Sequence, residues 1–237
     1  MDASFHIARN GLHVGTIRQS VIANNLSNLT TDGFRAHLVD PATIAGPGTR
    51  VLGVRETMQH GSPRQTGQET DLYLDGEGFF RVRTEEGIAY TRHGHFRVDG
   101  EGNLVTATGY LLEPPITVPD DTEHLGVTPD GTVLAIDFAG NATELGQLEL
   151  TRFINPTGLI AIGDSLYAEG PNAGDPRDGT PGDEGFARVL AGALEESTVD
   201  PAQEITSQII NQRYYQLNLR SFQTSDAIVS HTLDLFS

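Results

Sequence analysis

The chain has 237 residues, a formal net charge of −17 at pH 7, and neither cysteine nor tryptophan. The missing cysteines exclude thiol catalysis, thiolate metal sites and disulfide scaffolds. The negative net charge, with 15 scattered arginines and no lysine, argues against duplex nucleic acid or acidic membranes as partners. The length suffices for a buried core without metals or disulfides, as one large domain or two small ones.

The N-terminal segment is predicted to be helical. Apolar residues recur at helical spacing over residues 4–29. Gly11 and Gly15 weaken this helix, because a glycine in a helix interior costs up to about 1 kcal/mol. We therefore expect it to depend on tertiary or intersubunit packing. Gly33 ends the helical region, and Phe34 is expected to anchor the exit of the chain.

Residues 36–70 show little periodicity and contain several glycines and prolines. A short β-prone piece covers residues 49–54. This stretch is predicted to be an extended connector. Two alternatives stay open: a loop, or a segment that becomes ordered only against neighbouring subunits.

Residues 71–196 predict an all-β domain, because short β-prone segments alternate with turn pairs such as Asp99-Gly100 and Thr108-Gly109. A stretch rich in Gly, Pro and Asp, 170–185, is expected to be an exposed loop. The candidate strands are 72–74, 79–82, 88–91, 95–98, 103–106, 116–118, a short piece at Val127, 132–136, 147–153 and 166–168.

The last segment, 197–237, predicts a long helix. Asp200 before Pro201 is typical of a helix N-cap followed by proline in the first turn. Apolar or long side chains recur at steps of three and four residues in an imperfect heptad seam, which contains Gln212 and Gln216. A second apolar strip follows another face. Two such faces favour two sets of neighbours, so the helix is predicted to pack in an assembly rather than only on its own core.

Candidate chemical sites are weak. His93 and His95 would face the same side of a strand, and Asp99 or Asp121 would complete a metal site, but no third ligand is recognisable and solvated turn residues are the favoured interpretation. The acidic loop within 170–185 does not match a calcium-loop spacing.

Motifs for catalysis and phosphate binding are also missing. The Gly-x-Gly of residues 75–78 lies between two predicted strands, so it is predicted to be a turn and not a phosphate-binding loop. The serines lack a Gly-x-Ser-x-Gly context. We expect no catalytic, cofactor-binding or metal residues, no cofactor and no enzyme activity.

The sequence carries no recognisable membrane or secretory address. No apolar run approaches the roughly twenty residues that span a bilayer, and the first residues lack the basic start and apolar core of a cleavable signal peptide. We expect no membrane insertion and no cleaved signal.

Several blocks in order along the chain resemble one known family. The segment VIANNLSNLTTDGFRA (residues 21–36) is similar to the N-terminal signature of the bacterial flagellar rod, hook and hook-basal body proteins. Residues 74–82, 89–112, 145–169 and 192–226 resemble the later blocks of the same family. The likeness covers most of the chain and is nearest to the members that form the distal rod. A proximal rod or other hook-basal body axial component is the alternative.

Three features depart from that pattern. The connector after Phe34 is shorter than in typical distal rod members, the usual Ala-Tyr pair is Tyr214-Tyr215, and the usual alanine of the asparagine motif is Ser27.

The resemblance implies an α+β fold in which discontinuous N- and C-terminal helices pair as a coiled coil, with a central mainly-β domain inserted between them. The implied segments are 1–35 (N-terminal helix), 36–70 (connector), 71–196 (β domain) and 197–237 (C-terminal helix). The candidate assembly-interface residues are Phe5, Leu12, Ile17, Val21, Leu26, Leu29, Phe34, Ile205, Ile209, Gln212, Gln216, Leu219, Phe222, Val229 and Leu233.

In function, the resemblance implies a non-enzymatic subunit of the flagellar basal-body rod, in its periplasm-spanning part, that transmits torque from motor to hook. Its implied partners are copies of itself, neighbouring rod and hook axial proteins, the flagellar type III export apparatus and the surrounding ring bushing. The terminal helices are expected to be largely disordered before assembly. A second interpretation, a stand-alone β-rich binding module, would place its site at His93, His95 and the acidic loop.

Overall fold

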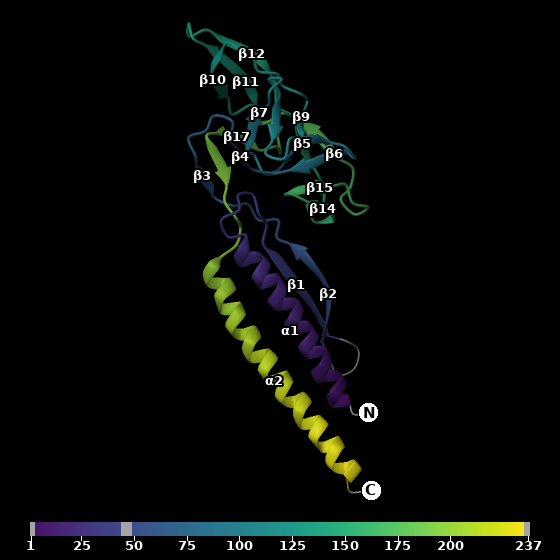
Figure 1. Cartoon of the computed structure of the whole chain (residues 1–237). Helices are drawn as coiled ribbons and strands as arrows, with labels where there is room; N and C mark the ends of the chain where they lie inside the picture. The colour runs from purple at the N-terminus through teal and green to yellow at the C-terminus, as the bar shows by residue number, and fades with distance from the viewer. Residues whose placement is uncertain (1–2, 44–48, 235–237) are drawn as a thin grey trace. The chain divides into compact units, whose positions relative to one another are not determined.

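The computed structural model describes residues 3–43 and 49–234. The chain divides into two compact units. The first takes its residues from 1–30, 35–57 and 199–237, and the second from 31–34 and 58–198. Two terminal helices with a mostly β region between them give the α+β class that the sequence predicts (Figure 1).

The first unit contains both long helices, α1 (Ala3–Ser27) and α2 (Pro201–Asp234). α2 begins where the sequence predicts, since the Asp200 carboxylate accepts hydrogen bonds from the backbone N–H groups of Ala202, at 2.9 Å, and Gln203, at 3.2 Å. The helices run antiparallel, with the first turn of α1 and the last turn of α2 at the same end of the pair (Figure 1).

A β-hairpin completes the first unit. Strands β1 (His37–Thr43) and β2 (Thr49–Glu56) pair antiparallel, with a register shift between Asp40 and Pro41, and both strands pack on α1. They lie within the stretch predicted to be an extended connector. The first part of this stretch is therefore a paired hairpin and not an unpaired connector. The β-prone piece at 49–54 had indicated strand β2 but not its partner β1.

The second unit is built from short strands, as predicted for an all-β insert. Its largest sheet has the strand order β14-β15-β6-β5-β9-β8-β7, with β13 paired to β5 and β16; smaller sheets are β10-β11-β12, β17-β4 and β18-β3. The strands are β3 (Pro63–Gln65), β4 (Leu72–Asp75), β5 (Phe79–Thr84), β6 (Gly87–Thr91), β7 (Phe96–Val98), β8 (Leu104–Thr106), β9 (Leu111–Glu113), β10 (Thr122–Val127), β11 (Thr132–Asp137), β12 (Ala142–Gln147), β13 (Leu150–Arg152), β14 (Ile160–Gly163), β15 (Leu166–Ala168), β16 (Arg177–Gly179), β17 (Arg188–Ala191) and β18 (Ala193–Glu195), with a short 3-10 helix at Pro156–Gly158.

The main hydrophobic core lies in this second unit, around fully buried residues such as Phe80, Phe96 and Leu150. One predicted strand, 116–118, is present only as the single bridge between Thr117 and Asn103. Prolines flank it on both sides and remove the ladder donors that a continuous strand needs. The predicted loop 170–185 holds the short strand β16.

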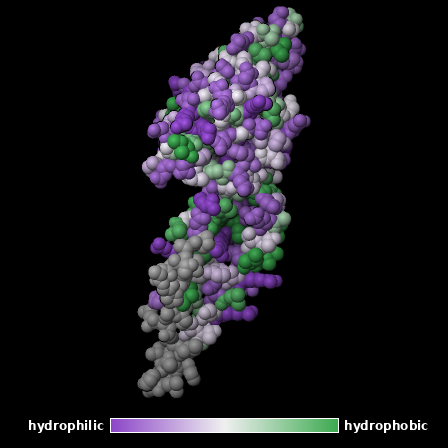
Figure 2. Space-filling model, turned by 180° about the vertical axis from the view of Figure 1, so that it is seen from behind, coloured by the Kyte–Doolittle hydropathy of each residue, from purple (hydrophilic) through white to green (hydrophobic). Residues whose placement is uncertain are grey.

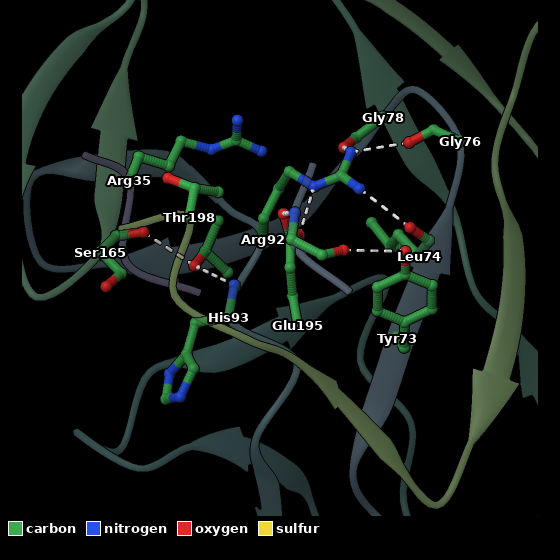
Figure 3. A network of polar contacts seen from close by, with 12 residues as sticks. Arg35, Tyr73, Leu74, Gly76, Gly78, Arg92, His93, Ser165, Glu195 and Thr198 are labelled. Atoms are coloured by element: carbon green, nitrogen blue, oxygen red, sulfur yellow. Dashed lines mark hydrogen bonds and ion pairs between the residues drawn. The ribbon is translucent and has the colours of Figure 1, made fainter. Parts of the chain in front are cut away.

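A buried ion pair lies in the interior of the second unit (Figure 3). Arg92 Nε donates to Glu195 Oε2 at 2.9 Å, and both side chains are 2% exposed. The rest of the Arg92 guanidinium donates to the backbone carbonyls of Leu74, Gly76 and Gly78, at 2.8 to 2.9 Å. The two bonds to Gly76 and Gly78 fix the turn predicted at residues 75–78 through its backbone carbonyl groups.

Candidate assembly interface

Polar and small residues form much of the contact between α1 and α2. Along α2 the residues at seven-residue spacing, Glu204, Asn211, Asn218 and Ser225, are all half-buried or buried. A seven-residue repeat keeps one face of a helix against its neighbour. This seam is not apolar, so hydrophobic periodicity did not reveal it; its signal in the sequence is the regular spacing of the polar residues.

Glycines on α1 let the two helices approach closely. A Cβ atom added at Gly11 would lie 2.2 Å from Asn218 Oδ1, and one added at Gly15 would lie 3.2 Å from Tyr215 Cδ2. The glycines that weaken α1 on its own thus serve its packing against α2.

Two ring contacts lie on either side of these glycines. The rings of Phe5 and Phe222, both predicted interface residues, are 4.6 Å apart between centroids. The Arg18 guanidinium lies 5.6 Å from the centroid of the Tyr214 ring, a cation–π contact made by the tyrosine that departs from the usual Ala-Tyr pair.

Asn25 joins three elements of the first unit. Its side-chain amide accepts the backbone N–H of His37 at 2.8 Å, donates to the His37 carbonyl at 2.9 Å, and donates to Glu204 Oε1 at 2.8 Å. Asn25 is 1% exposed. One side chain of α1 therefore pairs with β1 as a neighbouring strand would and also contacts the first turn of α2. Sequence reasoning did not select this residue.

The predicted seam of α2 faces elsewhere. Ile205, Ile209 and Leu219 are 52%, 49% and 38% exposed, and Gln212 and Gln216 are exposed as well. Hydrophobic residues are visible among hydrophilic ones on the surface of this unit in Figure 2. The chain itself covers this strip only in part, so its role at an interface stays a prediction about neighbouring molecules.

The other predicted interface residues divide into three groups. On α1 and just after it, Phe5, Leu12, Ile17, Val21, Leu26 and Leu29 are half-buried, and so is Phe222 on α2. Phe34 belongs to the second unit, where its carbonyl accepts the Thr198 N–H at 3.0 Å. The side chains of Val229 and Leu233 lie outside the described residues.

The histidine pair is not a solvated turn, which corrects the favoured interpretation. His93 and His95 are half-buried, with ring centroids 6.1 Å apart, and His95 Nδ1 lies 2.6 Å from Oδ1 of the buried Asp71. Burial, and secondarily the neighbouring His95, lowers the pKa of His93. Within the described residues no group of three or more His, Cys, Asp or Glu side chains is arranged to hold a metal ion.

Membrane crossing by a helix has no support in the described part of the chain: neither α1 nor α2 combines the length and the apolar character that a membrane-spanning helix needs.

Three family models match successive parts of the chain. Residues 5–35 match the model of the family "Flagella basal body rod protein", residues 73–135 match "Flagellar hook protein FlgE/F/G D1 domain", and residues 190–235 match "Flagellar basal body rod FlgEFG protein C-terminal".

Full-length relatives extend the match over nearly the whole chain. The flagellar basal-body rod protein FlgG of Borreliella burgdorferi is 36% identical over 92% of this chain and 93% of its own length. The FlgG proteins of Bacillus subtilis, 35% identical over 91% of this chain and 92% of their own, and of Buchnera aphidicola subsp. Schizaphis graminum, 34% identical over 97% and 98%, are similar in the same way. The chain therefore belongs to the flagellar basal-body rod protein family.

Proposed function

We propose that this rod subunit polymerises through its two terminal helices, as part of the distal rod, and transmits torque from motor to hook. It is a structural protein and not an enzyme, as its rod-protein relatives are. The observation that carries the polymerisation is the exposed strip of Ile205, Ile209 and Leu219 on α2. Apolar side chains repeated along one face of a helix are stabilised when another molecule covers them.

In this arrangement α1 and α2 pair as a coiled coil within each subunit and pack against helices of neighbouring subunits. The β unit faces outward, where it meets neighbouring rod and hook axial proteins and the surrounding ring bushing. The chain reaches the periplasm-spanning rod through the flagellar type III export apparatus, without a cleaved signal. Family membership and the close antiparallel contact of α1 with α2 support this assignment.

The test places a charge on the exposed strip. The double variant Ile209→Asp, Leu219→Asp should leave the chain exported but stop rod assembly and abolish swimming, because each buried aliphatic side chain contributes about 1.5–3 kcal/mol to an interface and the charge adds a desolvation cost. Swimming in soft agar and electron microscopy of isolated basal bodies give the readout.

The matched control is the double variant Thr206→Asp, Thr224→Asp, which adds the same two charges at exposed polar positions of the same helix. It should assemble and swim normally. Normal rods in the Ile209/Leu219 double variant would refute the proposed interface.

A further inference from the structure

Asn211 of α2 is a buried residue with an incomplete set of hydrogen bonds. It is 4% exposed, and its Nδ2 donates to the Gly15 carbonyl at 2.9 Å and to Gln19 Oε1 at 3.3 Å. Among the residues that the structure describes, none donates to its Oδ1. The amide orientation is fixed, because turning it over would set its oxygen against the Gly15 carbonyl, which only accepts.

Asn218, the next asparagine of the same seam, shows that an unpaired buried side-chain oxygen is not a general feature of the seam. Asn218 lies seven residues further along α2 and also packs on a glycine, Gly11. Its Nδ2 donates to the Tyr214 carbonyl of its own helix at 2.8 Å. It is not among the buried side chains that lack a partner in the described structure. A buried acceptor without a donor is destabilising, and the described residues of the single chain supply no donor to Asn211 Oδ1.

A groove lies beside Asn211. It has a volume of about 320 Å³ and runs between α1 and α2, lined by Gly15 and Gln19 from α1 and by Asn211, Gln212, Tyr215 and Gln216 from α2. Its side chains are mainly carboxamides. Gln212 and Gln216 stand exposed on its rim, in the same strip as Ile209 and Leu219. The groove is therefore continuous with the surface proposed for polymerisation.

We propose that this groove receives a glutamine side chain from α2 of a neighbouring copy, whose amide N–H group donates to Asn211 Oδ1 and fixes the register between copies. The chain has no lysine, and the polar side chains set within its exposed apolar strip are Gln212 and Gln216. A neutral carboxamide donates without adding charge, which suits copies that each carry −17. A buried asparagine at one heptad position specifies register at some expense in stability. The inference rests on the proposed function, because it requires neighbouring copies.

Register is measured by cross-linking in assembled rods. The chain has no cysteine, so a single introduced cysteine is unique. Chains with Thr16→Cys, at the rim of the groove, are co-assembled with chains that carry one cysteine at Ile209, Arg213, Leu217 or Arg220, and oxidative cross-linking identifies which pairs meet. The parent should give one dominant pair. Asn211→Leu should still form rods, but lower the ratio of the dominant to the shifted pairs about tenfold, the effect expected of one hydrogen bond to a buried group.

Three further variants separate an effect on register from an effect on folding. Asn218→Leu should keep the dominant pair of the parent. Gln212→Glu combined with Gln216→Glu keeps Asn211 and the side-chain shapes but removes the donors, so it should disperse the cross-links as Asn211→Leu does. Thr206→Glu combined with Thr224→Glu adds the same two charges at exposed positions of the same helix that lie off the strip, and should keep the dominant pair.

The possible failures are distinguishable. If the parent gives no copy-to-copy cross-link at all, the proposed polymerisation through the helices is wrong, and the inference falls with it. If the parent gives one dominant pair and both Asn211→Leu and the double glutamate variant keep it, only the role of Asn211 is refuted. Equal dispersal by Asn218→Leu refutes it as well, since the effect would then belong to the seam in general.

Discussion

At the residue scale, the Arg92–Glu195 pair is a buried polar constraint inside the β unit. Glu195 Oε1 also accepts the Gly61 N–H at 2.9 Å. Glu195→Ala would leave the Arg92 guanidinium buried without its counter-charge, so we expect a loss of about 3–5 kcal/mol in the free energy of unfolding. Urea denaturation of the full chain measures it. Arg83→Ala, which removes a pair whose arginine is 62% exposed, should cost less than about 1 kcal/mol. Equal effects of the two variants would contradict this account.

Two turns of the β unit are stabilised in the same way, by an aspartate side chain that accepts backbone hydrogen bonds. Asp99 and Asp137 each accept backbone N–H groups two and four residues ahead, and hydrogen bonds lower the pKa of both, from Asn103 first for Asp99 and from Asn141 first for Asp137. A carboxyl whose pKa is lower in the folded than in the unfolded chain stabilises the fold above its unfolded pKa, about 3.9, and loses this contribution as the pH falls through the folded value.

We therefore expect the urea midpoint of the β unit to fall as the pH drops from about 5 to about 3. The double variant Asp99→Asn, Asp137→Asn should show a shallower fall over the same range, because two of the responsible carboxylates are gone. A pH profile unchanged by the double variant would show that other carboxylates account for the loss.

At the element scale, Asn25 determines how the hairpin is attached to the helices. Asn25→Ala removes the two hydrogen bonds between this side chain and the backbone of His37, and each such bond contributes about 0.5–1.5 kcal/mol. In isolated rods the amides of β1 and β2 should exchange with solvent at least tenfold faster than in the parent. Asn24→Ala, the exposed neighbour of the same residue type, should change little. Unchanged exchange in Asn25→Ala would mean that packing alone holds the hairpin.

The elements also show what the sequence reveals and what it conceals. The start of α2 was predictable because Asp200 and Pro201 act locally on the backbone. β17 was not, because it pairs with β4 more than a hundred residues earlier and its own pattern is too short to stand out. The seam between the helices was concealed in part for another reason: beside the predicted pair of Phe5 and Phe222, it contains glycines and the polar series of Asn211 and Asn218, whereas apolar periodicity also selects the strip of Ile205 and Ile209, which lies at the surface.

At the scale of the whole molecule, the two units differ in what holds them together. The β unit has a large apolar core built around Phe80, Phe96 and Leu150. Among the described residues of α1, the buried apolar side chains are Ala8, Val14 and Ile22, and its partner helix contributes mainly polar residues to their contact. A helix pair with so little buried apolar surface and two interior glycines gains much of its stability only when other molecules cover it.

This difference predicts two exchange behaviours in one chain. In the purified monomer at low concentration, the amides of α1 and α2 should exchange within seconds to minutes, while those of β5 and β6 remain protected for hours, because the β unit opens only by global unfolding. In assembled rods the helix amides should become protected as well, since assembly adds the missing apolar contacts. Hydrogen exchange read by mass spectrometry compares the two states. Helices as well protected in the monomer as the β unit would show that they fold before assembly and not through it.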